Sequence, residues 1–307
     1  MSDQNSVKLI YDLKLHFAID LNGFTAKSRT EIFSARIAPV QINYLGYPST
    51  MGSSFIDYIV ADKILIDNQT RKNYLEKVIF MPNTYQPNDN QRLINKNKTS
   101  KQNHNLPENS FVICCFNNTY KISQDEFEVW INILDKVNDS VLWLLECEDQ
   151  TKKNLREFAK QNKINQNRLV FAKKINHYQH LERLRHADIF VDTFNYNAHT
   201  TCSDALWAGI PVVTKKGKQF ASRVASSLLN AVGLQEMICN TRDEYKNLIL
   251  DLANNRKKVE ELKNKLNQNI KTKPLFNTKQ YTSDFESCLE IILKNRIKNL
   301  QDEDIFL

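Results

Sequence analysis

The 307-residue chain has no apolar run long enough to cross a bilayer. Its first residues, MSDQNSVKLIYDLK, also lack the apolar core of a secretory signal peptide. With 41% hydrophobic residues, the chain still has enough apolar side chains to form one large domain or two domains of ordinary size. We therefore expect a soluble, cytoplasmic protein that has no membrane partner.

The six cysteines form no pattern typical of a metal site or of a disulfide framework. They are scattered, with no Cys-x-x-Cys pair and no His and Cys at zinc spacing, and most lie in apolar runs typical of reduced core residues. The net charge of +7 comes from Lys and Arg residues that are spread along the chain rather than gathered in one patch. The sequence therefore predicts no metal site and no nucleic-acid partner.

What the chain does contain is an alternation of strand-like and helix-like segments, which indicates mainly parallel sheets. In residues 1–85 the expected strands are 15–23, 40–46, 58–62 and 78–82, with a helix at 29–36. Residues 86–109 are rich in Asn, Gln and Lys and have too few apolar side chains to pack, so we expect a linker.

Residues 110–275 again alternate between strands and helices, which predicts a complete doubly wound domain. Ser123 and Glu126 should form the capping box of one of its helices, and a single long helix is expected from residue 241 to about 270. The last segment, 276–307, should be a helix that packs back on the first half.

The most informative stretch is DTFNYNAHTTCSDALWAGIPVVT, residues 192–214. It places a polar loop and a short helix between two apolar strands. His199, Thr200 and Thr201 directly precede this helix, and Asp204 lies within it. Free amides and the positive dipole end at the start of a helix suit a phosphate, and a nearby carboxylate suits a ribose. The alternative is an ordinary helix cap with a surface histidine.

Two more loops carry polar residues after expected strands of the second domain. Asn118 and Lys121 follow the strand FVICCF, where a lysine can neutralise a diphosphate leaving group or can be a solvated surface residue. His177, His180 and Arg183 recur at helical spacing on one face. That face suits contacts with a nucleobase or is a solvated surface, since two histidines without a further ligand make a weak metal site. Polar residues after three strands of one sheet together favour a nucleotide site.

Longer stretches of the chain resemble the catalytic region of the intracellular protein O-linked N-acetylglucosamine transferases and their bacterial and plant relatives. The matching stretches cover nearly the whole chain and include DLKLHFAIDLNGFT, APVQINYLGYPSTMG, FNNTYKI, HADIFVDTFNYNAHTTCSDALWAGIPVVT and LFNTKQYT. The resemblance implies an α/β glycosyltransferase of GT-B type, with a complete C-terminal doubly wound, Rossmann-like domain, a truncated N-terminal Rossmann-like half and C-terminal helices. It also implies inverting transfer of a sugar, most often N-acetylglucosamine, from a UDP-sugar to Ser or Thr hydroxyls of proteins, without a metal ion or a cofactor.

The resemblance assigns roles to the polar residues of the second domain. Lys121 corresponds to a lysine that contacts the diphosphate and stabilises the departing UDP. His180 and Arg183 correspond to positions around the uracil and the nearby phosphate. The phosphate- and ribose-binding loop of the family corresponds to His199, Thr200, Thr201 and Asp204.

In the first half, Asp12 and His16 correspond to residues that line the reaction centre, where they could relay the proton of the acceptor hydroxyl. Two positions depart from the family: Asn118 stands where relatives have Gln, and His177 stands where many have Lys. The tetratricopeptide repeats and the first strands of the family's N-terminal domain have no counterpart in this chain. Two alternatives follow, namely a UDP-binding module without transferase activity of its own, or a subunit that needs a tetratricopeptide-containing partner.

Overall fold

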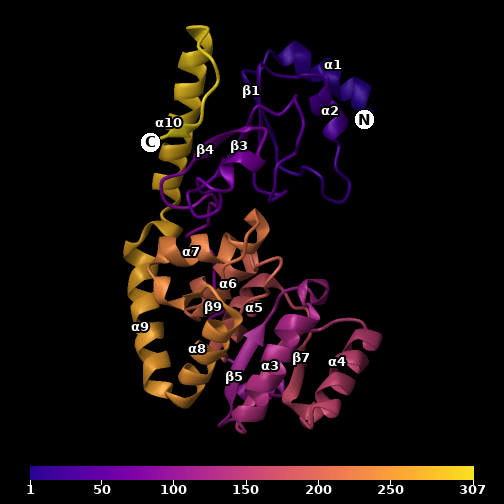
Figure 1. The fold of residues 1–307 in the computed structure, drawn as a ribbon, viewed down its shortest axis with the longest axis vertical. Helices are drawn as coiled ribbons and strands as arrows, with labels where there is room; N and C mark the ends of the chain where they lie inside the picture. The colour runs from indigo at the N-terminus through magenta and orange to yellow at the C-terminus, as the bar shows by residue number, and fades with distance from the viewer. The chain divides into compact units, whose positions relative to one another are not determined.

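The computed structural model describes all residues, 1–307, and divides the chain into two units (Figure 1). Unit 1 consists of Met1–Pro87 and Asn277–Leu307, and unit 2 consists of Asn88–Phe276. The chain therefore leaves unit 1 once and returns to it for its last segment. None of the helices is both long enough and apolar enough to span a membrane.

Unit 1 contains a five-stranded sheet of order β1-β2-β3-β4-β11, in which every neighbouring pair of strands is parallel. The strands are β1 (Phe17–Asp20), β2 (Val40–Asn43), β3 (Tyr58–Ala61), β4 (Lys77–Phe80) and β11 (Ile305–Phe306). The first four correspond to the expected strands, although each is shorter. β11 has no counterpart among the expected strands, because two residues are too few to show a period.

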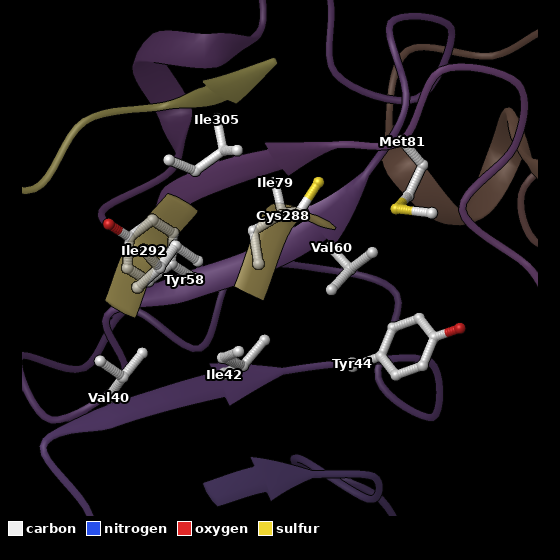
Figure 2. Close-up of a cluster of buried hydrophobic side chains, with 10 residues drawn as sticks. All are labelled: Val40, Ile42, Tyr44, Tyr58, Val60, Ile79, Met81, Cys288, Ile292 and Ile305. Atoms are coloured by element: carbon white, nitrogen blue, oxygen red, sulfur yellow. The ribbon is translucent and has the colours of Figure 1, made fainter. Parts of the chain in front are cut away.

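The two faces of this sheet are covered by different helices. These are α1 (Asp3–Leu13), α2 (Thr30–Ser34) and α10 (Thr278–Ile297). On one face, Cys288 and Ile292 of α10 pack into the main cluster of unit 1 (Figure 2). Ile19 of β1 packs against this cluster, whereas its neighbour Ala18 packs with Ile32 of α2 in a second cluster. The alternation of side chains along a strand explains this division.

Residues 3–13 form a helix, α1, that the apolar pattern does not predict. The Ser2 side chain starts the helix by accepting a hydrogen bond from the Asn5 amide at 3.3 Å, and Lys14 ends it in the left-handed conformation with φ 50°. Asp12 therefore lies in this helix, ahead of the strand that was expected at 15–23.

Unit 2 contains a six-stranded parallel sheet of order β10-β9-β8-β5-β6-β7. Its strands are β5 (Phe111–Cys115), β6 (Ser140–Leu145), β7 (Leu169–Ala172), β8 (Ile189–Val191), β9 (Val212–Lys215) and β10 (Ile238–Cys239). The chain runs outward from β5 through β6 to β7, then returns to the other side of β5 with β8 and continues outward. β5 and β8 therefore flank the point where the strand order reverses, and ligands of doubly wound sheets bind at the carboxyl ends of strands at such a point.

The helices of unit 2 are α3 (Gln124–Lys136), α4 (Asp149–Gln161), α5 (His177–Leu184), α6 (Thr200–Trp207), α7 (Val224–Val232), α8 (Arg242–Asn254) and α9 (Arg256–Thr272). The predicted capping box at the start of α3 is confirmed, with Ser123 and Glu126 each bonded to the other's backbone amide. Residues 241–270 are not the single helix that we expected. The Asn255 side chain accepts a hydrogen bond from the Lys258 amide at 3.2 Å and caps a new helix, α9.

Residues 88–109, which we call the strap, pack on unit 2 and are not the free linker that their composition predicts. Leu106 of the strap is buried. Arg92 forms an ion pair with Asp204 of α6, with 2.6 Å between Nη1 and Oδ1, and its guanidinium lies over the Trp207 ring. The strap is held largely by ion pairs and hydrogen bonds, which is why an apolar count gives no sign of its packing.

Candidate functional site

The candidate site lies at the carboxyl ends of β5 and β8, where the strand order of unit 2 reverses. The loop after β5 carries Asn117 and Lys121, the loop after β8 begins at Asp192, and α6 starts at Thr200. Side chains of these loops are joined by direct hydrogen bonds, such as Asn117 Nδ2 to Asp192 Oδ1 at 3.3 Å. The loops that the sequence pattern links to a nucleotide are thus neighbours in space.

Asp192 is the centre of the hydrogen-bond network at this site. Its side chain is fully buried. Oδ1 accepts from the amides of Thr193 at 2.9 Å and Ala198 at 2.6 Å, and Oδ2 accepts from the Thr214 hydroxyl at 2.7 Å. Burial raises the pKa of Asp192 to about 7 in spite of these hydrogen bonds. The sequence pattern assigned no role to this residue, although it ends the apolar run IFVD. Its carboxyl group fixes the shape of the loop that leads to α6.

Asn117 connects the loop after β5 to the start of α6. Its Nδ2 donates to Thr193 Oγ1 at 2.8 Å, and its Oδ1 accepts from the Thr201 hydroxyl at 2.7 Å. Thr201 was predicted to bind phosphate, but its hydroxyl proton is donated within the protein. Thr200 is exposed at the first position of α6. Thr201 therefore holds the start of the helix in place, and Thr200 offers the more open hydroxyl.

Lys121 brings a positive charge to the same place. It is half-buried at the end of η3 (Thr119–Lys121). Its Nζ donates to the carbonyl oxygen of Asn197 at 3.1 Å and lies 4.0 Å from the centre of the Tyr196 ring. Desolvation lowers the pKa of Lys121, because the ammonium group is partly removed from water. An ammonium group has three donors, so one bond to a carbonyl leaves it able to bind an anionic oxygen.

α6 begins without a side-chain cap. His199 occupies the N-cap position but makes no capping hydrogen bond. Its ring stacks on Tyr196 with 4.8 Å between ring centres, and its Nε2 lies 3.3 Å from the carbonyl oxygen of Ala221. Burial lowers the pKa of His199 to about 3, so the ring is neutral. The alternative of an ordinary side-chain cap with a surface histidine is therefore wrong, and amides of the first turn are available to an anion.

His180 and Arg183 of α5 form a brace against Phe116 at the end of β5. Arg183 Nε donates to His180 Nδ1 at 3.0 Å, and both side chains pack on the Phe116 ring. Arg183 is buried, and its Nη1 also donates to the carbonyl oxygen of Lys173. Since Nδ1 of His180 accepts a hydrogen bond, the neutral ring carries its proton on Nε2, which remains a donor. In the structure Arg183 orients His180, and its predicted contact near the uracil and the phosphate stays a prediction.

Asp204 does not present a free carboxylate. Oδ1 pairs with Arg92 of the strap at 2.6 Å, and Oδ2 lies 3.1 Å from Nε2 of the exposed His177. A ribose contact by Asp204 would therefore involve a carboxylate that is already paired on both oxygens. Arg92 lies 112 positions away in the sequence. Nothing in the composition of the strap singles out Arg92, so sequence reasoning had no signal for this partner.

A pocket of about 770 Å³ runs along the carboxyl ends of β5, β6 and β7. Its lining includes Asn118, Glu146 and Lys173, and the Asn118 side chain is exposed. Small-molecule sites typically measure about 300–1,000 Å³. The amide that was predicted to contact the nucleotide thus faces a space large enough for a nucleoside.

Asp12 and His16 are not at the corresponding edge of the sheet in unit 1. Asp12 is exposed on α1, and His16 is exposed directly before β1, at the amino end of that strand. Ligands of parallel sheets bind at the carboxyl ends, where Asp20 and Asn43 are paired in the register of β1 and β2. The catalytic role of Asp12 and His16 stays a prediction that rests on the resemblance.

The neutral state of His180 predicts how stability depends on pH. Burial lowers the pKa of His180 to about 3 from 6.5, so below pH 6.5 the unfolded chain takes up a proton that the folded protein does not. The stability that the neutral His180 ring contributes is fully present above pH 6.5, the pKa in the unfolded chain, and is lost as the pH falls toward 3. Between pH 7 and pH 5, wild-type protein should lose about 2 kcal/mol more unfolding free energy than His180→Asn, whose side chain does not titrate.

Urea unfolding followed by tryptophan fluorescence measures this difference in unit 2. All three tryptophans, Trp130, Trp143 and Trp207, lie in that unit. His180→Asn keeps an oxygen that can accept from Arg183, so the comparison isolates the titration of the ring. Equal pH dependence of the two proteins would contradict a buried, neutral His180.

Comparison with known proteins connects this geometry to one family. The model of glycosyl transferase family 41 matches residues 3–99 and 95–285. The probable UDP-N-acetylglucosamine–peptide N-acetylglucosaminyltransferase SEC of Arabidopsis thaliana is 36% identical over 292 residues, which cover 93% of this chain and 30% of that protein. The UDP-N-acetylglucosamine–peptide N-acetylglucosaminyltransferase of Caenorhabditis elegans is 26% identical in an alignment of 386 positions. This alignment covers 90% of this chain and 34% of that protein. The chain therefore spans about a third of the length of these relatives.

Solved structures agree with this result. The Thermobaculum terrenum O-GlcNAc transferase superposes with a TM-score of 0.84 at 25% identity, over 94% of this chain and 54% of that chain. Anabaena HepE in complex with UDP-glucose superposes with a TM-score of 0.59 at 14% identity, over 93% and 82%, which is a likeness of fold alone. The resemblance inferred from the sequence and the predicted GT-B-type α/β fold are both confirmed.

Proposed function

Because the chain belongs to glycosyl transferase family 41, we propose that it transfers N-acetylglucosamine from UDP-N-acetylglucosamine to Ser or Thr hydroxyls of proteins. Its relatives in Arabidopsis thaliana and Caenorhabditis elegans are named as UDP-N-acetylglucosamine–peptide N-acetylglucosaminyltransferases. Unit 2 binds the nucleotide sugar. The hydroxyl attacks the sugar carbon as UDP leaves, which inverts the configuration at that carbon.

The position of Lys121 is the observation that carries this proposal. Its half-buried ammonium group lies beside the start of α6, a helix without a side-chain cap, at the point where the strand order reverses. A diphosphate bound there meets a fixed cation and the amides of a helix N-terminus. As UDP leaves, negative charge grows on the diphosphate, and Lys121 stabilises that charge. These groups together take the place of a divalent metal ion at the diphosphate.

The neutral state of His180 suits the same proposal. Its Nδ1 is occupied by Arg183 and its pKa is lowered to about 3, so Nε2–H acts as a neutral donor. A neutral donor can bind a nucleobase carbonyl or a phosphate oxygen without repelling Lys121. His180 therefore adds no positive charge to those of Lys121 and Arg183.

Calorimetry with UDP tests the donor site. We expect the full chain to bind UDP in buffer freed of divalent metal by a chelating resin, with an affinity that added Mg²⁺ changes by less than about twofold, because Lys121 and helix amides already balance the diphosphate charge. GDP is the matched control for the nucleobase and should bind more weakly. A folded protein that gives no heat with UDP, or that binds UDP only with Mg²⁺, would contradict the proposed donor site.

Transfer is measured with radiolabelled UDP-N-acetylglucosamine and a library of Ser- and Thr-containing peptides. UDP-glucose and GDP-fucose serve as competing donors, and each assay runs with and without an added tetratricopeptide-containing protein. Labelled peptide with the chain alone supports the whole proposal. Labelled peptide only with the added protein identifies a subunit, and UDP binding without any transfer identifies a UDP-binding module.

A further inference from the structure

A second cluster of polar side chains in unit 2 lies where the strap meets the end of α5. His104 ends η2 (Lys101–His104) in the strap, and Glu182 and His186 are one helical turn apart at the end of α5. One ligand atom from each residue, two ring nitrogens and a carboxylate oxygen, lies within 4.8 Å of the others. Glu182 is buried and both histidines are half-buried. None of the three was predicted to take part in a site.

All three side chains meet at one place, the hydroxyl of Thr99. Thr99 Oγ1 lies 2.9 Å from Nε2 of His104, 2.8 Å from Nε2 of His186 and 2.8 Å from Oε2 of Glu182. A hydroxyl has a single proton, so it donates to only one of these atoms and accepts from the others. The Thr99 amide donates to Oε1 of Glu182 at 2.9 Å, which leaves Oε2 as the oxygen that faces the centre.

The protein supplies no fixed cation to this cluster. Glu182 is 4% exposed, and the basic side chain within ion-pair range is His186 at 3.7 Å. The guanidinium of Arg183 is bonded to His180 and to a backbone carbonyl. Buried carboxylates in proteins are paired with a cation or coordinate a metal ion, and the ion-pair partner of this one is a histidine rather than a Lys or an Arg.

We propose that His104, Glu182 and His186 bind one Zn²⁺ ion, which fastens the strap to α5. Two imidazoles and a carboxylate are a known donor set for zinc, which takes a fourth ligand such as water. Mg²⁺ and Ca²⁺ fit this set poorly because they prefer oxygen ligands. Zinc bonds of about 2.0–2.1 Å place tetrahedral ligand atoms about 3.3 Å apart. The ligand atoms of the three residues lie within 4.8 Å of one another, so each pair has to close by at most about 1.5 Å.

Binding requires two local changes. The Thr99 side chain turns about its Cα–Cβ bond, so that its hydroxyl leaves the centre. The rings of His104 and His186 carry their proton on Nδ1 and present the Nε2 lone pair to the ion. The Thr99 amide stays on Oε1 of Glu182 and orients the carboxylate, as outer partners of metal ligands do. Because α5 also carries His180, the ion would tie the strap to a helix of the donor site.

Zinc binding is tested on the full chain after metal has been removed with a chelator and the chelator washed out. Calorimetry with Zn²⁺ should give one ion per chain, and Co²⁺ as a probe should show the visible absorption of four-coordinate cobalt. His186→Gln and Glu182→Gln should each weaken Zn²⁺ binding by at least about 100-fold. Loss of a residue that only bonds to a metal ligand weakens binding by up to about 100-fold, and loss of a ligand itself should cost at least as much. His16→Gln removes an exposed histidine of unit 1 and should bind Zn²⁺ like the wild type.

Zn²⁺ should also raise the melting temperature of wild-type unit 2, measured by tryptophan fluorescence, but not that of His186→Gln. The half-buried His186 follows the last turn of α5, so His186→Gln decides the question even if Glu182→Gln does not fold. Wild-type protein that binds no Zn²⁺, or that binds it equally well after His186→Gln, would overturn the proposal. The zinc ligands are not residues of the UDP site, so failure here leaves the result for UDP unchanged.

Discussion

Replacing Lys121 with methionine should lower the rate of sugar transfer by about 100- to 1,000-fold, the loss typical when a preorganised donor to a developing negative charge is removed. The Lys121 ammonium group makes one hydrogen bond, to the Asn197 carbonyl, and lies over the Tyr196 ring. Methionine keeps much of the length and the contact with the ring but carries no charge. The unfolding free energy of unit 2 should therefore change by about 1 kcal/mol or less, while UDP binding weakens.

The measurements are turnover with UDP-N-acetylglucosamine, UDP affinity by calorimetry and urea unfolding by tryptophan fluorescence. Lys160→Met removes the same charge from the exposed surface of α4 and should leave all three unchanged. UDP affinity is the readout if the chain alone transfers no sugar. A collapse of unit 2 in Lys121→Met would make Lys121 a structural residue, and unchanged affinity and turnover would remove it from the site.

Asp192→Ala should destabilise unit 2 by about 3–5 kcal/mol, more than any other change considered above. It leaves the buried amides of Thr193 and Ala198 and the hydroxyl of Thr214 without their acceptor. Each buried donor that loses its partner costs about 1–3 kcal/mol. Because the same carboxyl group shapes the loop to α6, UDP affinity should fall together with stability. Urea unfolding and calorimetry with UDP measure the two effects.

Asp192→Asn is the matched control. Its oxygen can accept from the same two amides, and its NH₂ group can donate to Thr214, whose hydroxyl then turns to accept. Burial raises the pKa of Asp192 from 3.8 to about 7, so the stabilisation from its bound proton is complete below pH 3.8 and is lost as the pH rises through 7. Asp192→Asn should therefore gain stability relative to the wild type as the pH rises from 4 to 7. If Asp192→Ala and Asp192→Asn lost equal stability at every pH, the hydrogen bonds of Asp192 would not be the source of the destabilisation.

Local patterns were sufficient to predict a mainly parallel α/β arrangement in both units. Short apolar runs alternate with amphipathic helices, and the capping box of Ser123 and Glu126 marks a helix start; both signals depend only on near neighbours. The same reasoning identified Lys121 and the loop before α6 as a candidate site. The apolar pattern did not predict α1 and did not separate α8 from α9. It gives little sign of a short surface helix or of a side-chain cap such as that of Asn255.

The partners of the polar residues could not be predicted from local patterns. Asp204 pairs with Arg92 across 112 positions, and Asp192 binds the Thr214 hydroxyl across 22 positions. The composition of the strap suggests a free segment, because composition gives no sign that Arg92 pairs with α6 or that Thr99 bonds to α5. Arg183 has the spacing of a ligand contact, yet it lies buried as a brace for His180.

The sequence by itself therefore determined the α/β class, the family resemblance and the loop that offers a donor site, because apolar period, capping and motif are properties of neighbouring residues. Only the tertiary structure decided that Asp192 organises this loop, that Arg92 neutralises Asp204, and that two histidines and a glutamate converge on Thr99. A hydrogen bond, an ion pair or a metal site depends on the distance between side chains from separate elements, and that distance is set when the elements pack.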